Sequence, residues 1–350
     1  MIGGGCVADA FLSIAFRVLV NLESLNSVET VGNLVRHRTA PIVVPSGDGG
    51  YSIRFVPTVS GESLAHAYQV HLVEEAKRVG LPLSEESERG EFIKFADESF
   101  LEKYGVKVPG SEREIRRAEV EIMLRDYVCD VGGFLYAGRY PVKRTSTFQV
   151  GYMVPAVFEV EAAALEAQFH VRFTPSLMSL QQPYNVEVGS AVYTFTLNMD
   201  ISQIAKPSTS FGERDEKLEK QLENEKEKRV TAALSALSIF LTQLRFGAKR
   251  SRFLPNMEPL SAIAAVSRNT FFVVSPGNSK KFIEETVSRK SSFEALMKEL
   301  RKGEKEDGAG VLLFAMDKEK AIEKVEGVDV SGNLEEFLKR VVAAVKGKAS

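Results

Sequence analysis

The chain has 350 residues, 44% of them hydrophobic and 26% charged, and its formal net charge is −2. This length supports one large domain or two ordinary ones, and the charge balance excludes a uniformly basic nucleic-acid coat, because phosphate binding depends on Lys and Arg. No apolar stretch approaches the roughly 18 residues that span a membrane, and the N-terminus lacks the basic-then-apolar pattern of a signal peptide. The two cysteines offer neither a disulfide framework nor zinc-site spacing. We therefore expect a cytoplasmic protein without a metal, a cofactor or a membrane partner.

Charge is unevenly distributed along the chain, although its sum is small. Acidic residues concentrate in 85–126 and 213–228, while basic residues form islands at 36–38, 139–144 and 249–252. Nucleic-acid binding depends on where the cations lie as well as on their total. The basic islands are therefore candidate contacts for an anionic partner.

The first predicted element is a strand near the N-terminus. Apolar side chains occupy every even position from Leu12 to Leu22, and the odd positions turn polar at Ser13, Arg17 and Asn21. This period-2 alternation predicts a strand with one buried face and one partly open face.

A hairpin, a helix and an insertion are predicted next. Residues 41–57 predict two short strands around a Gly-rich turn. A helix is predicted from an N-cap at Ser60 to a stop at Gly80, because apolar residues recur between them at a spacing of four. Residues 81–131 are charged, with helical runs, no clear strand and no core of their own, and they predict a helical insertion.

A second, longer hairpin is predicted in the middle of the chain. Residues 166–173 alternate between an apolar face and a polar face that carries Gln168, His170 and Arg172. The partner strand alternates in the same way after a connection, 174–191, that is too long for a tight turn.

The remainder of the chain predicts two amphipathic helices and two buried strands. The helices occupy 230–244 and 334–345, and the strands occupy 270–275 and 310–316. The order of elements predicts an α+β fold in which helices back an antiparallel sheet. The β-α-β-β-α-β plan shared by ferredoxins and RNA-recognition modules is one such arrangement.

Motifs of the common enzyme classes are absent from the sequence. There is no GxxxxGK[ST] phosphate loop, no HExxH and no GxSxG. His66 and His71 are five residues apart on the predicted helix, so they do not share a face and are poor joint metal ligands. The sequence therefore contains no recognisable set of catalytic residues for a hydrolase or a transferase.

The basic islands carry the remaining chemistry, and each has a structural alternative. The first follows a Gly-Asn pair that lets backbone and guanidinium groups approach a phosphate, although it is also consistent with an ordinary surface loop. Residues 132–146 interleave aromatic and basic side chains, as single-stranded nucleic-acid binding requires, although the aromatics also suit a core. Residues 246–252 place three basic groups just beyond a helix end, where cations also act as caps.

Together these segments resemble one family. The stretches NLESLNSVETVGNLVRHR, SIRFVPTVSGESLAHAYQ, VGGFLY to KRTS, and FGAKRSR with AVSRNTFFVVSPG are similar, in this order, to the DevR family of CRISPR-associated proteins. That family supplies the backbone subunit of type I interference (Cascade) complexes, and the resemblance is to its archaeal type I-A branch. It covers residues 8–278.

The resemblance implies an α+β fold with an RNA-recognition- or ferredoxin-like antiparallel sheet, a helical insertion and a long hairpin thumb. We accordingly divide the chain into a core at 1–80 and 132–300, with the thumb at 174–191, an insertion at 81–131, and a C-terminal strand and helix at 301–350 that pack on the core.

The resemblance also implies a non-enzymatic function. Several copies would assemble along a CRISPR RNA and present it for pairing with target DNA, so that base pairing reads the sequence and the protein holds the backbone. The implied partners are the CRISPR RNA, target DNA through the guide, further copies of the chain and other Cascade subunits.

The predicted RNA-binding residues come from the family pattern and from the polar face of the sheet, which suits backbone holding better than base stacking. In the thumb, Met178 or Leu180 is the candidate wedge between bases. The predicted RNA-binding residues are Arg17, Asn21, Asn33, Arg36, His37, Arg38, Ser60, Gly61, Lys143, Arg144, Thr145, Ser146, Gln168, His170, Arg172, Lys249, Arg250 and Arg252.

Two other functions are open on the sequence. An RNA-processing endoribonuclease of related fold would use His170 as a general base and Arg172 as a cationic stabiliser. A regulatory or structural protein would use the basic islands to bind a protein partner.

Overall fold

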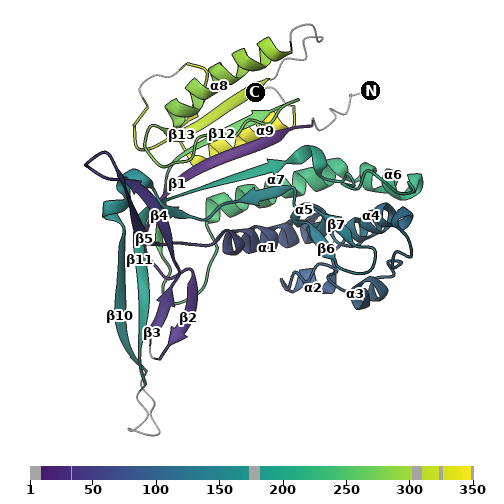
Figure 1. Ribbon diagram of the computed structural model, residues 1–350, viewed down its shortest axis with the longest axis horizontal. Coiled ribbons are helices and arrows are strands. Elements are labelled where there is room, and N and C mark those ends of the chain that lie inside the picture. Colours follow the sequence, from purple (N-terminus) through teal and green to yellow (C-terminus); the bar gives the residue numbers. More distant parts are fainter. Residues whose placement is uncertain (1–8, 33, 173–181, 302–309, 323–325, 348–350) are drawn as a thin grey trace.

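A mixed β-sheet forms the centre of the molecule (Figure 1). The computed structural model describes residues 9–32, 34–172, 182–301, 310–322 and 326–347. The sheet runs in the order β14–β13–β12–β1–β11–β3–β2, and β8, β9 and β10 also pair with β11. Its strands are β1 (Phe11–Glu23), β2 (Ser27–Val31), β3 (Leu34–His37), β8 (Phe148–Val150), β9 (Val154–Pro155), β10 (Ala164–Arg172), β11 (Gln182–Asp200), β12 (Asn256–Ser267), β13 (Val311–Asp317) and β14 (Asp329–Ser331).

The predicted α+β fold is confirmed. In chain order the core elements are β1, α1 (Gly61–Val79), β10, β11, α7 (Lys226–Gln243) and β12, which is a β-α-β-β-α-β series. Their spatial order, β12–β1–β11–β10, is antiparallel throughout and is that of a ferredoxin-like sheet. Helices α1 and α7 share one buried cluster with the apolar face of β1, and Tyr68 of α1 donates a hydrogen bond to the Ala233 carbonyl of α7 (3.1 Å).

Helix α1 begins and ends as the sequence predicts. The Ser60 side chain accepts a hydrogen bond from the Ser63 backbone N–H at 3.3 Å, which makes it the N-cap. Gly80 ends the helix with a left-handed φ of 66°. The predicted hairpin that precedes the helix is also present, as β4 (Thr39–Pro45) and β5 (Tyr51–Pro57).

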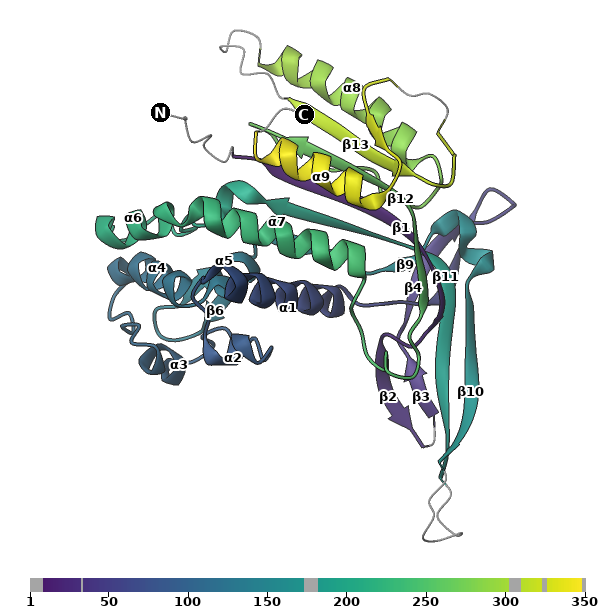
Figure 2. The same cartoon turned by 180° about the vertical axis from the view of Figure 1, so that it is seen from behind.

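Strand β1 is buried on both faces, so the prediction of a partly open face is wrong. Its even residues, such as Leu12 and Phe16, enter the cluster formed with α1 and α7. On its other face Ala15 enters a second cluster with α8 (Phe282–Leu300). Figures 1 and 2 show α8 on one side of the sheet, with α7 and α9 on the other. The C-terminal half of the chain therefore covers the face that the sequence pattern left open.

Residues 81–131 contain helices but share the main core. The helices are α2 (Glu85–Glu88), α3 (Glu98–Lys103), α4 (Ile115–Arg125) and the start of α5 (Tyr127–Gly132), with the 3-10 turn Glu112–Glu114. Leu101, Ile122 and Val128 are fully buried in the same cluster as α1. The segment thus forms no separate core among the described residues, because its apolar residues pack on α1 within the main cluster.

The predicted long hairpin is confirmed, but its connection is shorter than predicted. Strands β10 and β11 pair in register from Ala164↔Ser190 to Arg172↔Gln182, so half of 174–191 is strand. The two strands leave the sheet as a long arm, and β2 and β3 lie beside it (Figures 1 and 2). We call β10 with the first half of β11 the arm. Met178 and Leu180 lie outside the described residues.

The C-terminal region extends the sheet beyond β12. Strand β13 and helix α9 (Leu334–Val345) are present as predicted. Residues 270–275 are not a strand, although Phe272 and Val274 are buried beneath α8. Helix α6 (Glu216–Asn224) and the small ribbon of β6 (Phe134–Tyr136) with β7 (Val142–Arg144) complete the elements that matter below. No helix in the described ranges has the length and apolar character needed to cross a membrane.

Candidate nucleic-acid interface

Two basic islands that are distant in the sequence meet beside the arm. We call the region formed by residues 22–26, 36–38 and 248–254 the base of the arm. The Arg38 backbone N–H donates to the Asn26 carbonyl at 2.8 Å, and the Ala248 N–H donates to the Leu25 carbonyl at 2.7 Å. Gly247 has φ +82°, and a Cβ there would lie 2.6 Å from the Leu25 carbonyl oxygen. This close approach therefore requires glycine. One turn of the chain holds residues 36–38 beside the segment that starts at Lys249.

Three cationic side chains in these islands have buried nitrogens that lack a hydrogen-bond partner among the described residues. They are Nζ of Lys249 and Nε of Arg250 and Arg38. Burial lowers the pKa of Lys249, and burial together with the charge of Arg245 lowers the pKa of Arg250. Buried polar groups in folded proteins normally have partners. A phosphate oxygen placed here would supply the missing acceptor and the missing negative charge.

Aromatic side chains line a cavity beside these cations. The ring of His170 on β10 stacks on Tyr184 of β11 with 5.3 Å between centroids, and Phe253 meets His170 edge-on at 5.5 Å. Arg252 Nη1 donates to the Tyr184 hydroxyl at 3.3 Å. The cavity has a volume of about 410 Å³ and is also lined by Gln168, Leu22, Val188 and Leu254. Flat rings beside guanidinium and ammonium groups are the chemistry that holds unpaired bases and their phosphates.

The sequence pattern predicts only part of this cavity. Gln168, His170 and Arg252 are among the predicted residues, whereas Tyr184 and Phe253 are not. Tyr184 lies within the predicted connection, 174–191, and Phe253 directly follows the third basic island. An aromatic residue adjoining a basic run was the signal available for Phe253.

His37 fastens the first basic island to the sheet. Its ring Nε2 lies 2.7 Å from Glu23 Oε1, its Nδ1 lies 2.8 Å from the Arg38 carbonyl, and its backbone N–H donates to Glu187 at 2.7 Å. The His37 and Glu23 side chains are fully buried, and Tyr193 donates a hydrogen bond to the same carboxylate. Burial alone would lower the pKa of His37, but the hydrogen bond and charge of Glu23 outweigh it and the pKa is raised. His37 therefore positions Arg36 and Arg38 and does not itself reach the surface.

The stability of the protein should depend on the charge of His37. Because its folded-state pKa is raised, the contribution is fully present below the unfolded pKa of about 6.5 and is lost as pH rises through the folded pKa. His37→Gln should be less stable than wild type at pH 6, and the difference should shrink as pH rises. Urea denaturation across this pH range measures it. His66→Gln, an exposed histidine, is the control. A difference that stays constant with pH would contradict the assignment.

Arg17 is placed by the structure in the core rather than on an open face. Its guanidinium donates to Glu319 at 2.8 Å, to Glu159 at 3.0 Å and to the Gly277 carbonyl at 2.8 Å, and its side chain has no exposed surface. All of its nitrogens are therefore engaged within the chain. The prediction that Arg17 contacts RNA fails because residues far along the chain cover it.

Arg144 is likewise buried. Its Nη2 lies 2.5 Å from Asp130, its Nη1 lies 3.4 Å from Glu119, and Asp130 also pairs with Arg229 at 2.9 Å. These four side chains have 0–1% exposure. The group ties α4, α5 and α7 to β7. The prediction that Arg144 contacts RNA is therefore wrong, because its side chain is buried in ion pairs.

The neighbours of Arg144 lie at a different place from the arm base. Lys143 and Thr145 are exposed, and Ser146 donates to the Phe148 carbonyl at 2.6 Å. Thr145 and Ser146 line a cavity of about 200 Å³ that also includes Asn198, near the end of β11 opposite to Tyr184. The structure thus divides the predicted residues between two sites.

The remaining predicted residues have structural roles or lie outside the described part. Ser60 caps α1, and a Cβ on Gly61 would lie 2.8 Å from the Val150 carbonyl oxygen, so both are fixed by packing. Asn21 is half-buried opposite Asn256 in the sheet. Asn33 and the side chain of Arg172 lie outside the described residues.

The surroundings of His170 give no support to catalysis. Its ring contacts Tyr184 and Phe253, neither of which is a carboxylate or an ammonium group. Within the described ranges, no cluster of three or more His, Cys, Asp or Glu side chains is arranged to hold a metal ion. The arrangement can hold an anion and stack on a flat ring.

The fold defines a class of protein: a ferredoxin-like core from which a long β-arm projects, with unpaired cations at the base of the arm. Among solved structures, one that shares this fold is a chain of a CRISPR RNA-guided surveillance complex in a pre-nicking state. It matches 96% of this chain and 100% of that chain with a TM-score of 0.53 at 12% identity.

The chain belongs to the DevR/Csa2 family, described as CRISPR-associated negative auto-regulators, whose family model matches residues 14–287. It is 45% identical over 330 residues to the CRISPR-associated aCascade subunit Cas7/Csa2 2 of Saccharolobus solfataricus, covering 93% of this chain and 98% of that protein. The protein Cas7/Csa2 1 of the same organism is 36% identical, with 83% and 90% covered. Cas7/Cst2/DevR of Methanocaldococcus jannaschii is 26% identical, with 78% and 86% covered.

Proposed function

We propose that this chain binds CRISPR RNA as one of several copies in the backbone of a type I interference complex. The observation that carries the proposal is the group of unpaired, partly buried cations at the arm base, next to a cavity walled by aromatic rings. Its relative with 45% identity is named as an aCascade subunit, which supports the same assignment. The protein acts in the cytoplasm, and its other partners are target DNA, paired through the guide, and further Cascade subunits.

The arm base holds the RNA backbone and one or more bases. Arg38, Lys249 and Arg250 hold phosphates, because each has a buried nitrogen that needs an acceptor. Tyr184 and Phe253 offer ring faces for stacking on a base. Lys143 and Thr145, at the far end of β11, contact another part of the RNA. Arg17, His37 and Arg144 support the fold.

The protein is a scaffold and does not cleave RNA. The His170 ring stacks on Tyr184 and meets Phe253 edge-on, so it serves as a contact in the cavity rather than as a general base. Incubation with a labelled repeat-containing RNA tests this directly. We expect retention without cleavage, and RNA-dependent growth in particle size by light scattering, because a head-to-tail contact does not close. Cleavage that is lost in His170→Ala would overturn the scaffold assignment.

The contribution of base stacking to RNA affinity should be measurable by removing the ring of Tyr184. Tyr184→Ala should weaken RNA binding by about 1–3 kcal/mol, roughly 5- to 150-fold, because that is the usual value of one base–aromatic stack. Tyr184→Phe keeps the ring and loses only the hydroxyl bonded to Arg252, so it should bind within a few-fold of wild type. Filter binding of both variants decides between a stacking role and a purely structural one. Equal losses in the two variants would exclude stacking.

A further inference from the structure

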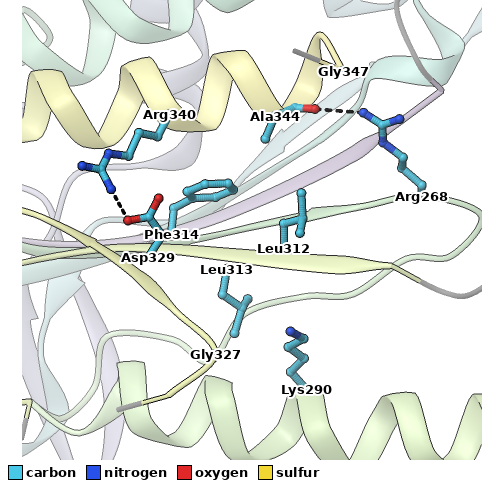
Figure 3. Close-up of a pocket in the computed structure, with 10 residues that line it drawn as sticks. All are labelled: Arg268, Lys290, Leu312, Leu313, Phe314, Gly327, Asp329, Arg340, Ala344 and Gly347. Atoms are coloured by element: carbon cyan, nitrogen blue, oxygen red, sulfur yellow. Dashed lines mark hydrogen bonds and ion pairs between the residues drawn. The ribbon is translucent and has the colours of Figure 1, made fainter. Parts of the chain in front are cut away.

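Another cavity lies away from the arm, at the outer edge of the sheet. It has a volume of about 480 Å³ and is lined by β13, by Lys290 of α8, by Arg340 and Ala344 of α9, and by Arg268, Gly327, Asp329 and Gly347. Figure 3 shows β13 running between the two helices, with Lys290 on one side and Arg268 and Arg340 on the other. Because α8 and α9 cover opposite faces of the sheet, the cavity is a slot open at the sheet edge.

Half of this edge has no strand beside it within the described residues. Strand β14 pairs with β13 only from Phe314↔Asp329 to Met316↔Ser331. Gly327, two residues before β14, has a left-handed φ of +86°. Residues 311–313 therefore lack a strand partner on the outer side, although they pair with β12 on the inner side.

The backbone groups on this half of β13 are oriented for a further strand. Arg268 donates its backbone N–H to the Gly310 carbonyl at 3.3 Å, so the antiparallel alternation points the N–H and C=O of Val311 and Leu313 outward. The outward N–H of Val311 donates to the Glu294 carboxylate at 3.4 Å and to no other group among the described residues. Leu312 is 50% exposed at the same place. An unpaired edge of this kind is a template for strand addition.

The charges around the slot select the partner. Its lining carries three cations, Arg268, Lys290 and Arg340, and one carboxylate, Asp329, which already pairs with Arg340. Arg268 donates from one nitrogen to the Ala344 carbonyl at 2.9 Å, and the Lys290 ammonium lies 3.8 Å from the Glu294 carboxylate, a long ion pair. Arg268 and Lys290 therefore face the slot from opposite sides of the sheet with little neutralisation. Side chains of an incoming strand alternate between these two sides.

We propose that this slot binds an extended acidic segment of a partner protein, which adds to the sheet along residues 311–313. Main-chain hydrogen bonds to Val311 and Leu313 hold the segment, and its carboxylates pair with Arg268 and Lys290. The slot is formed by β13, α8 and α9 and is separate from the proposed RNA interface, so the two activities are independent.

The test uses the full chain and a fluorescein-labelled peptide of alternating valine and glutamate, with a valine–lysine peptide as comparison. The acidic peptide should bind and should slow hydrogen exchange of the segment that contains Val311 and Leu313. Lys290→Glu should weaken binding roughly tenfold or more, because like charges are then juxtaposed. Lys298→Glu, the same change on an exposed part of α8, should leave binding unchanged.

The outcomes are distinct from those of the RNA assay. RNA retention should be equal in wild type, Lys290→Glu and Lys298→Glu, so loss of peptide binding alone supports the slot. Equal binding of the acidic and basic peptides would overturn the proposal. So would an exchange rate in residues 311–313 that is already slow in the free protein and does not change when peptide is added.

Discussion

Replacing Lys249 and Arg250 together with alanine is expected to weaken RNA binding by at least roughly 100-fold at low salt while leaving the fold at least as stable. Hydrogen bonds to charged groups contribute about 1.5–3 kcal/mol each, and two are lost. The slope of log affinity against log salt should fall by about 1.4, at roughly 0.7 per phosphate contact on a single strand. Stability should not fall, because both side chains have buried nitrogens without partners in the free protein. Filter binding at several salt concentrations and thermal melting measure the two effects.

A matched control variant removes two positive charges at a place far from the arm base. Lys298 and Lys339 are exposed on α8 and α9, so the double alanine variant lowers net charge equally without touching the arm base. It should keep the salt slope of wild type. An unchanged slope in the Lys249–Arg250 variant, or an equal change in the control, would remove the proposed phosphate site even though the family membership stands.

Arg144→Ala is expected to have the opposite pattern, with a large loss of stability and no direct loss of RNA contacts. Removing one partner of a buried ion pair leaves an uncompensated charge, which costs about 3–5 kcal/mol. Here the change removes one of the two ion pairs of Asp130 and the ion pair of Glu119 with residue 144, all within the interior. Urea denaturation gives the free energy of unfolding, and the fraction that remains folded should bind RNA with the salt slope of wild type.

The adjacent residue provides the control for Arg144. Lys143 is exposed, so Lys143→Ala should change the free energy of unfolding by no more than about 0.5 kcal/mol. If Arg144→Ala were as stable as Lys143→Ala and lost salt slope instead, Arg144 would be a phosphate contact and the buried ion pairs would be unimportant.

Local pattern alone predicted the elements whose causes are local. The capped helix from Ser60 to Gly80, the alternating hairpin, the C-terminal amphipathic helix and the order of the elements were sufficient for the ferredoxin-like plan. One exception has a tertiary cause. Residues 270–275 form a short apolar run that predicts a buried strand, but they pack under α8 without joining the sheet.

The sequence by itself determined the family, the core plan and the segments that carry basic charge, because these depend on residue order and short-range periodicity. Only the tertiary structure decided which cationic side chains are available to bind a phosphate. In the sequence, Arg17 and Arg144 look the same as Lys249 and Arg250. In the structure, however, the first two pair with carboxylates elsewhere in the chain, while the last two have buried nitrogens that lack a partner in the part of the chain that the structure describes. The cost of a buried charge is set by what surrounds it in space, and neighbours in the sequence do not determine those surroundings.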